Sequence, residues 1–205
     1  MYCRIATIAV VALGLSFTAQ AQSKIAPVAK LPTKPAATRT EDAQLFRNTT
    51  FGFRYKVPYG WVDRTKEMRE GDEAGKAELL GAFFERPPEA AGGTVNSAVV
   101  IAAESAASYP GLNDAAQYFG PLGEVTTAKG LTAVNEPYEF PVDAKPIVRC
   151  DFVKKLGAVT MHQSTLALLS KGYVVSFTFI GGSDDEVTML IENLAFGKVK
   201  TPVHK

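Results

Sequence analysis

The sequence is poor in the residues and motifs on which common enzymes depend. It contains two histidines, His162 and His204, and two cysteines, Cys3 and Cys150. Two histidines cannot form a three-histidine zinc site. Gly-x-Ser-x-Gly, P-loop, His-Glu-x-x-His and Cys-x-x-Cys motifs are absent from the sequence. These absences predict a protein without enzymatic activity, metal or cofactor.

The chain also lacks an excess of charge and a second long apolar segment. It has 22 Lys and Arg against 21 Asp and Glu. Binding of nucleic acid needs a basic footprint, so we expect no nucleic-acid partner. No segment after the N-terminus reaches the ~18 apolar residues of a membrane span. We therefore expect a mature chain without a transmembrane segment.

The N-terminus is typical of a signal peptide. Arg4 precedes an apolar run over residues 5–17, and Ala19-Gln20-Ala21 is a small-x-small cleavage site. We expect residues 1–21 to be removed during export to the periplasm or to the outside of the cell. Cys150 is then alone and cannot form an intramolecular disulfide. It is either a buried small apolar residue or a reactive thiol.

Composition divides the rest of the chain into three parts. Residues 22–44 are rich in Pro, Ala and Lys without an apolar period, which predicts a disordered linker. Residues 45–198 carry the apolar patterns of one domain. Residues 199–205 are expected to form a flexible basic tail.

A long β-hairpin is the clearest pattern within the domain. Residues 173–180 alternate with period two, so that one face carries Tyr173, Val175, Phe177 and Phe179. A two-residue turn at Lys171-Gly172 would place Leu168 opposite Val175 and Leu166 opposite Phe177.

An amphipathic helix should follow this hairpin. Ser183 and Glu186 have the spacing of a capping box. The positions i, i+3, i+4 and i+7 form an apolar stripe, made of Val187, Leu190, Ile191 and Leu194. Gly197 is placed to form a left-handed C-terminal cap. We expect the stripe to pack on the aromatic face of the hairpin.

The remaining patterns predict further strands and one short helix. Strands are expected over 45–46, 51–57, 79–86, 95–103, 138–140 and 147–154. A helix should begin at Asn113 or Asp114 and stop at Gly120-Pro121. The whole is an α+β fold, a predominantly antiparallel sheet of about seven strands sandwiched by helices.

This order of elements resembles the PsbP-like, or Mog-one-like, α/β/α sandwich superfamily. The resemblance rests on the aromatic strand FGFRYKVPYGW and on GYVVSFTFIGG leading into a capped helix, and it covers roughly residues 45–197. It implies the fold rather than a chemistry. The photosystem II and Ran-binding relatives both act by binding other proteins, and many bacterial relatives are exported.

One group of polar residues could form a site. A turn at Leu156-Gly157 would place Asp151 opposite His162 and Arg149 opposite Ser164. Asp151 could then orient His162 as a base. A cross-strand ion pair, or a hydrogen-bonded histidine within the sheet, explains the same residues.

Two aromatic residues, Tyr59 and Trp61, could border a ligand cleft, although such a tryptophan more often closes the edge of a sheet against a helix. We expect a working surface on loops at one end of the sheet, near Trp61 and residues 104–112.

These observations predict an exported, non-enzymatic binding or accessory protein of the cell envelope. Its partner would be another envelope protein, and the chain would be a monomer or weak oligomer. The alternative is a small-molecule or lipid carrier with a cleft between helix and sheet. A third hypothesis is an enzyme that uses Arg149, Asp151 and His162.

Overall fold

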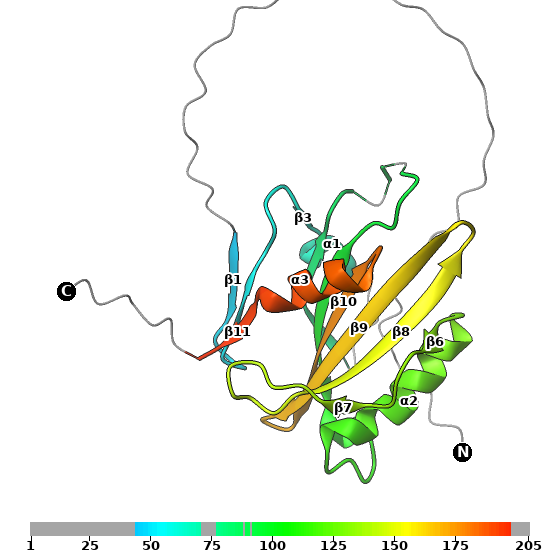
Figure 1. Ribbon diagram of the computed structural model, residues 1–205. Helices are drawn as coiled ribbons and strands as arrows, with labels where there is room; N and C mark the ends of the chain where they lie inside the picture. The colour runs from blue at the N-terminus through cyan, green and yellow to red at the C-terminus, as the bar shows by residue number, and fades with distance from the viewer. Residues whose placement is uncertain (1–43, 71–76, 88, 91, 198–205) are drawn as a thin grey trace, which may run out of the picture.

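The computed structural model describes residues 44–70, 77–87, 89–90 and 92–197. The predicted signal peptide, nearly all of the linker and the tail lie outside the described residues. An eight-stranded sheet occupies the centre of the domain, with strand order β3-β4-β5-β10-β9-β8-β6 and β7 also paired with β8 (Figure 1). The strands are β3 (Val62–Asp63), β4 (Ala77–Phe84), β5 (Ala98–Ser105), β6 (Thr132–Ala133), β7 (Tyr138–Glu139), β8 (Val148–Leu156), β9 (Val159–Ser170) and β10 (Tyr173–Gly181).

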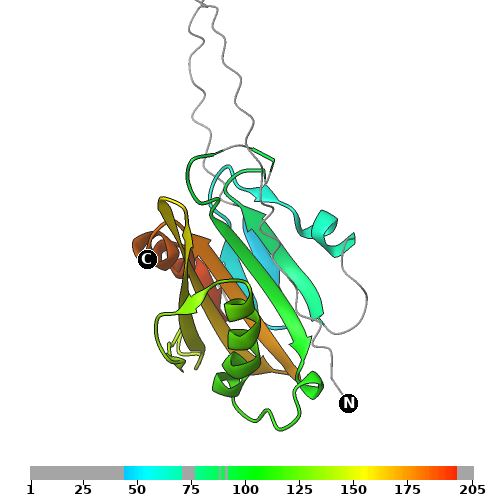
Figure 2. The same cartoon turned by 90° about the vertical axis from the view of Figure 1, so that its right-hand side faces the viewer.

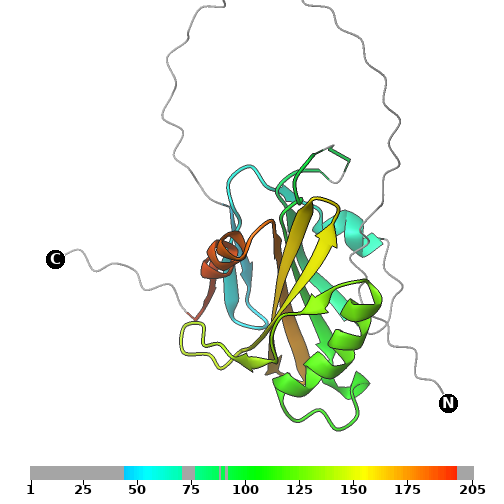
Figure 3. The ribbon, with the colours of Figure 1, turned by 45° about the vertical axis from the view of Figure 1, so that its right-hand side comes forward.

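A second, three-stranded sheet packs on one face of the first. Its order is β1 (Leu45–Asn48), β2 (Phe53–Lys56) and β11 (Leu194–Phe196). Helix α3 (Asp184–Glu192) lies on the same face, whereas α2 (Ala115–Ala128) covers the opposite face (Figures 2 and 3). Two short elements complete the domain, α1 (Thr65–Glu70) beside β4 and the 3-10 turn η1 (Ala106–Ser108) after β5.

The predicted fold class is confirmed, with one revision of the sheet. The strand pairs of both sheets are antiparallel. The aromatic strand around Phe53 and Tyr55 does not extend the main sheet, however. It pairs with β1 and β11 and directs its two buried rings onto the main sheet. Alternation predicted which face is buried but could not predict which strands are neighbours.

The β9–β10 hairpin has the predicted register. Leu168 pairs with Val175 and Leu166 with Phe177. Lys171 and Gly172 both adopt the left-handed region, with φ of 52° and 78°. This pair of positive φ angles is the geometry of the two-residue turn that matches the twist of a hairpin.

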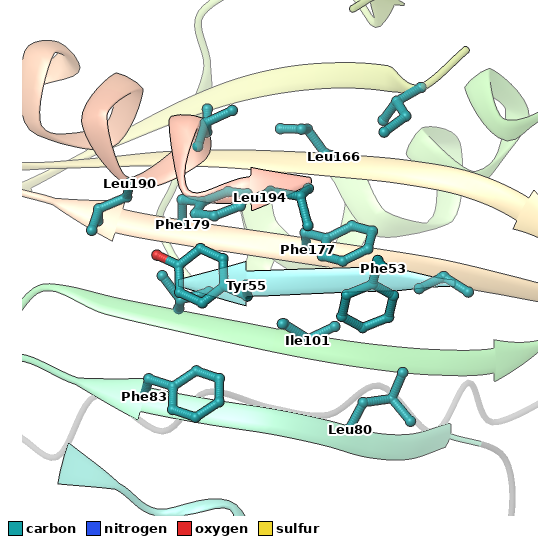
Figure 4. Close-up of a cluster of buried hydrophobic side chains, with 14 of the residues drawn as sticks. Phe53, Tyr55, Leu80, Phe83, Ile101, Leu166, Phe177, Phe179, Leu190 and Leu194 are labelled. Carbon is teal, nitrogen blue, oxygen red and sulfur yellow. The ribbon is translucent and has the colours of Figure 1, made fainter. Parts of the chain in front are cut away.

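Helix α3 packs on the aromatic face of this hairpin, as predicted. Val187, Leu190 and Ile191 join Phe177 and Phe179 in the main core, and Figure 4 shows several of these side chains together. Ser183 caps the helix by accepting a 3.2 Å hydrogen bond from the Glu186 amide. The second half of the predicted capping box is wrong, because the Glu186 carboxylate binds the Gly182 amide at 2.8 Å and the Ser97 hydroxyl.

The predicted end of this helix at Gly197 is also wrong. The helix stops at Glu192, and Leu194–Phe196 form β11. The Lys56 amide donates a 3.0 Å hydrogen bond to the Asn193 carbonyl, and Leu194 pairs with Tyr55. Leu194 is still buried, because a strand on the same face reaches the core as well as another helical turn would.

Helix α2 is longer than predicted and runs through Gly120-Pro121 to Ala128. Proline within a helix costs ~3 kcal/mol because it removes one hydrogen bond and crowds the preceding turn. Beyond the proline, Leu122 and Leu131 pack into the cluster under α2. Burial of a leucine is worth roughly 1.5–3 kcal/mol. Leu131 is buried and Leu122 is half-buried, so their packing offsets much of the cost of the proline. A local helix-breaker rule does not include this contribution.

Candidate functional site

The residues singled out in the sequence fall at two distant places on the sheet. Tyr59 and Trp61 precede β3 at one edge, whereas Arg149 and Asp151 lie on β8 near the other edge. Strands β4, β5, β10 and β9 lie between them. Neighbouring strands are ~4.8 Å apart, so five strand spacings separate the two groups by roughly 24 Å. They do not form one site.

The predicted pairing of Asp151 with His162 is wrong by two residues. The β8–β9 turn is at Gly157-Ala158, with Leu156 paired to Val159. Asp151 therefore faces Ser164, while His162 faces Val153 and Arg149 faces Leu166. A shift of two residues keeps every side chain on its predicted face but changes its partner.

Asp151 is the centre of a dense polar network. One carboxylate oxygen accepts a hydrogen bond from Arg149 Nε at 2.8 Å and another from the Ser164 hydroxyl. The other oxygen accepts from Asn135 Nδ2 at 2.7 Å and from the Tyr138 hydroxyl at 3.2 Å. Arg149 also donates to Ser164 Oγ at 3.0 Å. The donors come from β7, β8, β9 and the loop after β6.

This network behaves as an internal ion pair. Burial alone would raise the pKa of Asp151, but hydrogen bonds from Ser164, Asn135 and Arg149, together with the arginine charge, lower that pKa overall. The guanidinium of Arg149 lies 5.0 Å from the centroid of the Phe140 ring. Both carboxylate oxygens are occupied by neighbours, so the arrangement anchors the 135–140 segment to the sheet rather than presenting a base to a substrate.

His162 is bonded elsewhere. Its Nδ1 lies 2.7 Å from a carboxylate oxygen of Asp184, in the first turn of α3. The Asp184 side chain is exposed. Among the described residues, no hydrogen bond joins His162 to Asp151. The histidine ties β9 to the start of α3, and the proposed Asp151–His162 dyad does not exist in this structure.

Tyr59 and Trp61 differ in exposure although they are two residues apart. The Tyr59 side chain is 73% exposed. Trp61 is half-buried and packs against the main core. Val62 pairs with Phe84, the last residue of β4. Ala77, the first residue of β4, pairs with Glu104 at the other end of the strand. The predicted working surface near both Trp61 and residues 104–112 is therefore two surfaces at opposite ends of the sheet.

A buried carboxylate beneath α2 was not singled out from the sequence. Glu104, at the end of β5, is 6% exposed. It accepts hydrogen bonds from the hydroxyl of Tyr118 at 2.6 Å and from that of Tyr109. Burial, and secondly the nearby Glu104 carboxylate, raise the pKa of both tyrosine hydroxyls, so both remain donors at neutral pH. The two rings meet edge to face, with centroids 5.4 Å apart.

An open groove of about 440 Å³ lies beside this Glu104–Tyr109–Tyr118 cluster. It runs between the chain after η1 and the first half of α2. Its walls are formed by Ser108, Tyr109, Pro110, Gly111, Leu112, Gln117 and Pro121. Glu104 holds Tyr109, and α2 carries Pro121, so both walls are fixed by buried structure. The groove is mainly apolar and offers a place for an apolar group of a ligand.

Cys150 faces α2 from β8 and is buried. Its thiol lies 3.4 Å from the Asn135 carbonyl. Burial, and secondly the charge of Asp151, raise the pKa of this thiol to about 11. The sequence left open a buried apolar residue or a reactive thiol, and this environment is that of a buried, protonated thiol.

Two further features concern only the part of the chain that the structure describes. In it, no three His, Cys, Asp or Glu side chains gather closely enough to hold a metal ion. Nor does that part contain a helix with the length and apolar character needed to cross a membrane.

Comparison with known proteins shows the fold. No family model matches the sequence, and no curated protein matches it. The structure is similar to the solution structure of the cyanobacterial PsbP protein, CyanoP, from Synechocystis sp. PCC 6803, with a TM-score of 0.53 and 13% identity over 80% of this chain and 98% of that chain. It also matches LpqN, involved in cell envelope biogenesis of Mycobacterium tuberculosis, with a TM-score of 0.41 and 13% identity over 76% and 90% of the two chains. The fold is PsbP-like, as the resemblance of the sequence predicted.

Proposed function

We propose that this protein is an exported, non-enzymatic accessory protein of the cell envelope, and that its groove beside α2 binds an apolar segment of another envelope protein. The observation that carries the proposal is the Glu104–Tyr109–Tyr118 cluster. It fixes the wall of a groove that opens to solvent on a loop-rich end of the sheet. The signal-like N-terminus supports export.

The cluster supports binding because it prepares the groove in advance. A tyrosine side chain that is already fixed by hydrogen bonds loses little conformational entropy when a ligand binds. The smaller entropy loss increases the binding affinity. Tyr109 and Pro110 supply rigid apolar surface with few rotatable bonds. Gln117 is engaged with the amides of Asn113 and Asp114, so the start of α2 is also fixed.

The polar network on β8 supports a non-enzymatic role. An enzyme that used Arg149, Asp151 and His162 would need them to converge on one substrate. Instead, Asp151 is saturated by neighbours and His162 binds Asp184. Under the proposal, His162→Ala and Asp151→Asn lower stability without removing a separate activity. Loss of an activity at an unchanged melting temperature would favour the enzyme hypothesis.

A carrier function has one observation in its favour, the volume of the groove. Ligand pockets commonly occupy roughly 300–1,000 Å³, and this groove lies in that range. The cleft expected between helix and sheet is not available on the α3 side, because Phe177, Phe179 and Leu190 fill the interface (Figure 4). A carried molecule would therefore have to lie in the open groove.

Site-specific photocrosslinking tests the proposal. A photoreactive residue at Leu112, in the groove, should give a defined adduct with one envelope protein in living cells. The same residue at Lys66, exposed on α1, should not. When the photoreactive residue is placed at a second position in the groove, the same adduct should form, and Leu112→Asp in that protein should abolish it. Equal adducts at both positions would refute the assignment, and a small molecule lost from the Leu112→Asp protein in native mass spectra would favour the carrier.

A further inference from the structure

The outer face of the three-stranded sheet is unlike the rest of the surface. Its inner face is apolar, with Phe53 and Tyr55 buried against the main sheet. On the outer face, Leu45, Arg47 and Lys56 are exposed and Arg54 is half-buried. The strands are at the side of the molecule away from α2 (Figure 3). This basic face, defined by Arg47, Arg54 and Lys56, is not needed to build the core.

The three cations lie close together, and the nearby Asp143 carboxylate accepts a 2.9 Å hydrogen bond from the Phe196 amide instead of pairing with them. Arg47 pairs directly with Arg54 across the two strands. Like charges placed opposite each other on a sheet are destabilising. Arg54 uses one guanidinium nitrogen to donate to the Gly197 carbonyl at 2.8 Å. Among the described residues, none of the three cations forms a salt bridge. Their charge is available to an anionic partner.

Apolar and aromatic groups flank the basic face. Leu45 is 40% exposed, and Tyr59 is 73% exposed. The Val57 amide donates to the Gln44 carbonyl at 2.9 Å, which holds the start of the Tyr59 loop beside the start of β1. Tyrosine and long basic side chains combine an apolar body with a polar end, and this combination suits the headgroup region of a bilayer.

Basic side chains near a bilayer surface attract anionic lipids, and each one raises partition onto the bilayer about fivefold. The three cations of the basic face supply this attraction from one side of the domain.

We propose that the basic face docks the protein on an anionic phospholipid bilayer. The geometry favours a bilayer over an acidic peptide. The cations project from the outer face of the paired strands β1 and β2. Among the described residues, they line neither the groove beside α2 nor the pocket around α1. A sheet face with exposed leucine and tyrosine beside it suits a headgroup plane, whereas an acidic peptide would need a bordered groove.

Vesicle sedimentation tests the proposal with the full mature chain. The protein should sediment with phosphatidylcholine vesicles that contain phosphatidylglycerol but not with phosphatidylcholine alone. Binding should weaken as salt is added, because exposed charges are screened. Arg47→Gln combined with Lys56→Gln should lower the partition coefficient about 25-fold, because each charge removed costs roughly a factor of five.

A matched variant separates this face from total charge. Lys66→Gln combined with Lys155→Gln makes the same change in charge at two exposed positions away from the basic face, and should leave binding within about twofold. Equal loss in both double variants would overturn the proposal. So would equal binding to neutral vesicles, or capture by an acidic peptide with no binding to vesicles. The Leu112→Asp variant should bind vesicles like the parent protein. A failed vesicle-binding proposal can therefore be distinguished from a failed proposal for partner binding in the groove.

Discussion

The buried carboxylate of Glu104 gives the sharpest test of the structure. Tyr118 is 3% exposed, and its hydroxyl donates a 2.6 Å bond to Glu104. Tyr118→Phe removes one oxygen and keeps the ring against Tyr109 and Phe119, whose centroids lie 5.4 Å and 6.0 Å away. The substitution therefore isolates the hydrogen bond from the packing.

The expected loss follows from where the bond lies. A hydrogen bond to a charged group is worth about 1.5–3 kcal/mol, and a buried acceptor left alone loses that amount in full. For a domain of this size, each kcal/mol lowers the melting temperature by roughly 2–4 °C. Tyr118→Phe should therefore lower it by roughly 3–12 °C. Tyr109 lines the open groove, so water can replace its hydroxyl, and Tyr109→Phe should cost about 1 kcal/mol or less.

Urea unfolding followed by circular dichroism measures both changes in free energy of unfolding. Tyr138→Phe is a matched control, because its hydroxyl makes a longer bond of 3.2 Å to Asp151 and its side chain is 39% exposed. Its cost should be below about 1 kcal/mol. The reasoning is refuted if Tyr118→Phe costs no more than Tyr109→Phe, or if all three variants unfold alike.

Three further predictions concern other parts of the domain. Asp151→Asn should lower the free energy of unfolding by about 2–3 kcal/mol at neutral pH, because it leaves Arg149 half-buried without its partner. The pKa of Asp151 is lowered from its ordinary 3.8, so this difference should be complete above that value and shrink as pH falls through the folded pKa in acid urea titrations. The Cys150 thiol should not react with Ellman's reagent at pH 8 until urea is added, because its pKa of about 11 leaves about one thiolate in a thousand; rapid native reaction would contradict the burial. Gly172→Ala should lower the free energy of unfolding by about 1 kcal/mol, because its φ of 78° lies in the left-handed region, which is unfavourable for alanine; an unchanged urea midpoint would show that the turn relaxes.

The sequence was most informative where local signals coincide. At the β9–β10 turn, the turn glycine, the alternation of residues 173–180 and the apolar pairs that it creates all favoured one register, and the structure has it. The β8–β9 turn shows the limit. A turn at Leu156-Gly157 and one at Gly157-Ala158 both keep Asp151 on the same face, so alternation could not choose between them. The choice depends on partners across the strands.

Long-range pairing was the second limit. Leu194 has the spacing of a helical stripe, yet it is in a strand because β2, more than a hundred residues earlier, provides a free edge. Pro121 is a breaker by local rules, but α2 passes through it because the packing of Leu122 and Leu131 offsets the lost bond. The Glu104–Tyr109–Tyr118 cluster joins β5, the segment after η1 and α2. No spacing rule connects these three elements before their packing is known.

The positions of the groove and the basic face on the fold have a consequence for the two proposals. The groove belongs to the α2 side, and the basic face belongs to the sheet that covers the other side of the same central strands (Figure 3). The core between them is closed by aromatic contacts such as Phe53 on Phe177, with centroids 4.9 Å apart. A bilayer on one side would therefore leave the groove open on the other. Under the two proposals, the protein would hold an envelope partner while it rests on a membrane, and neither ligand should compete with the other.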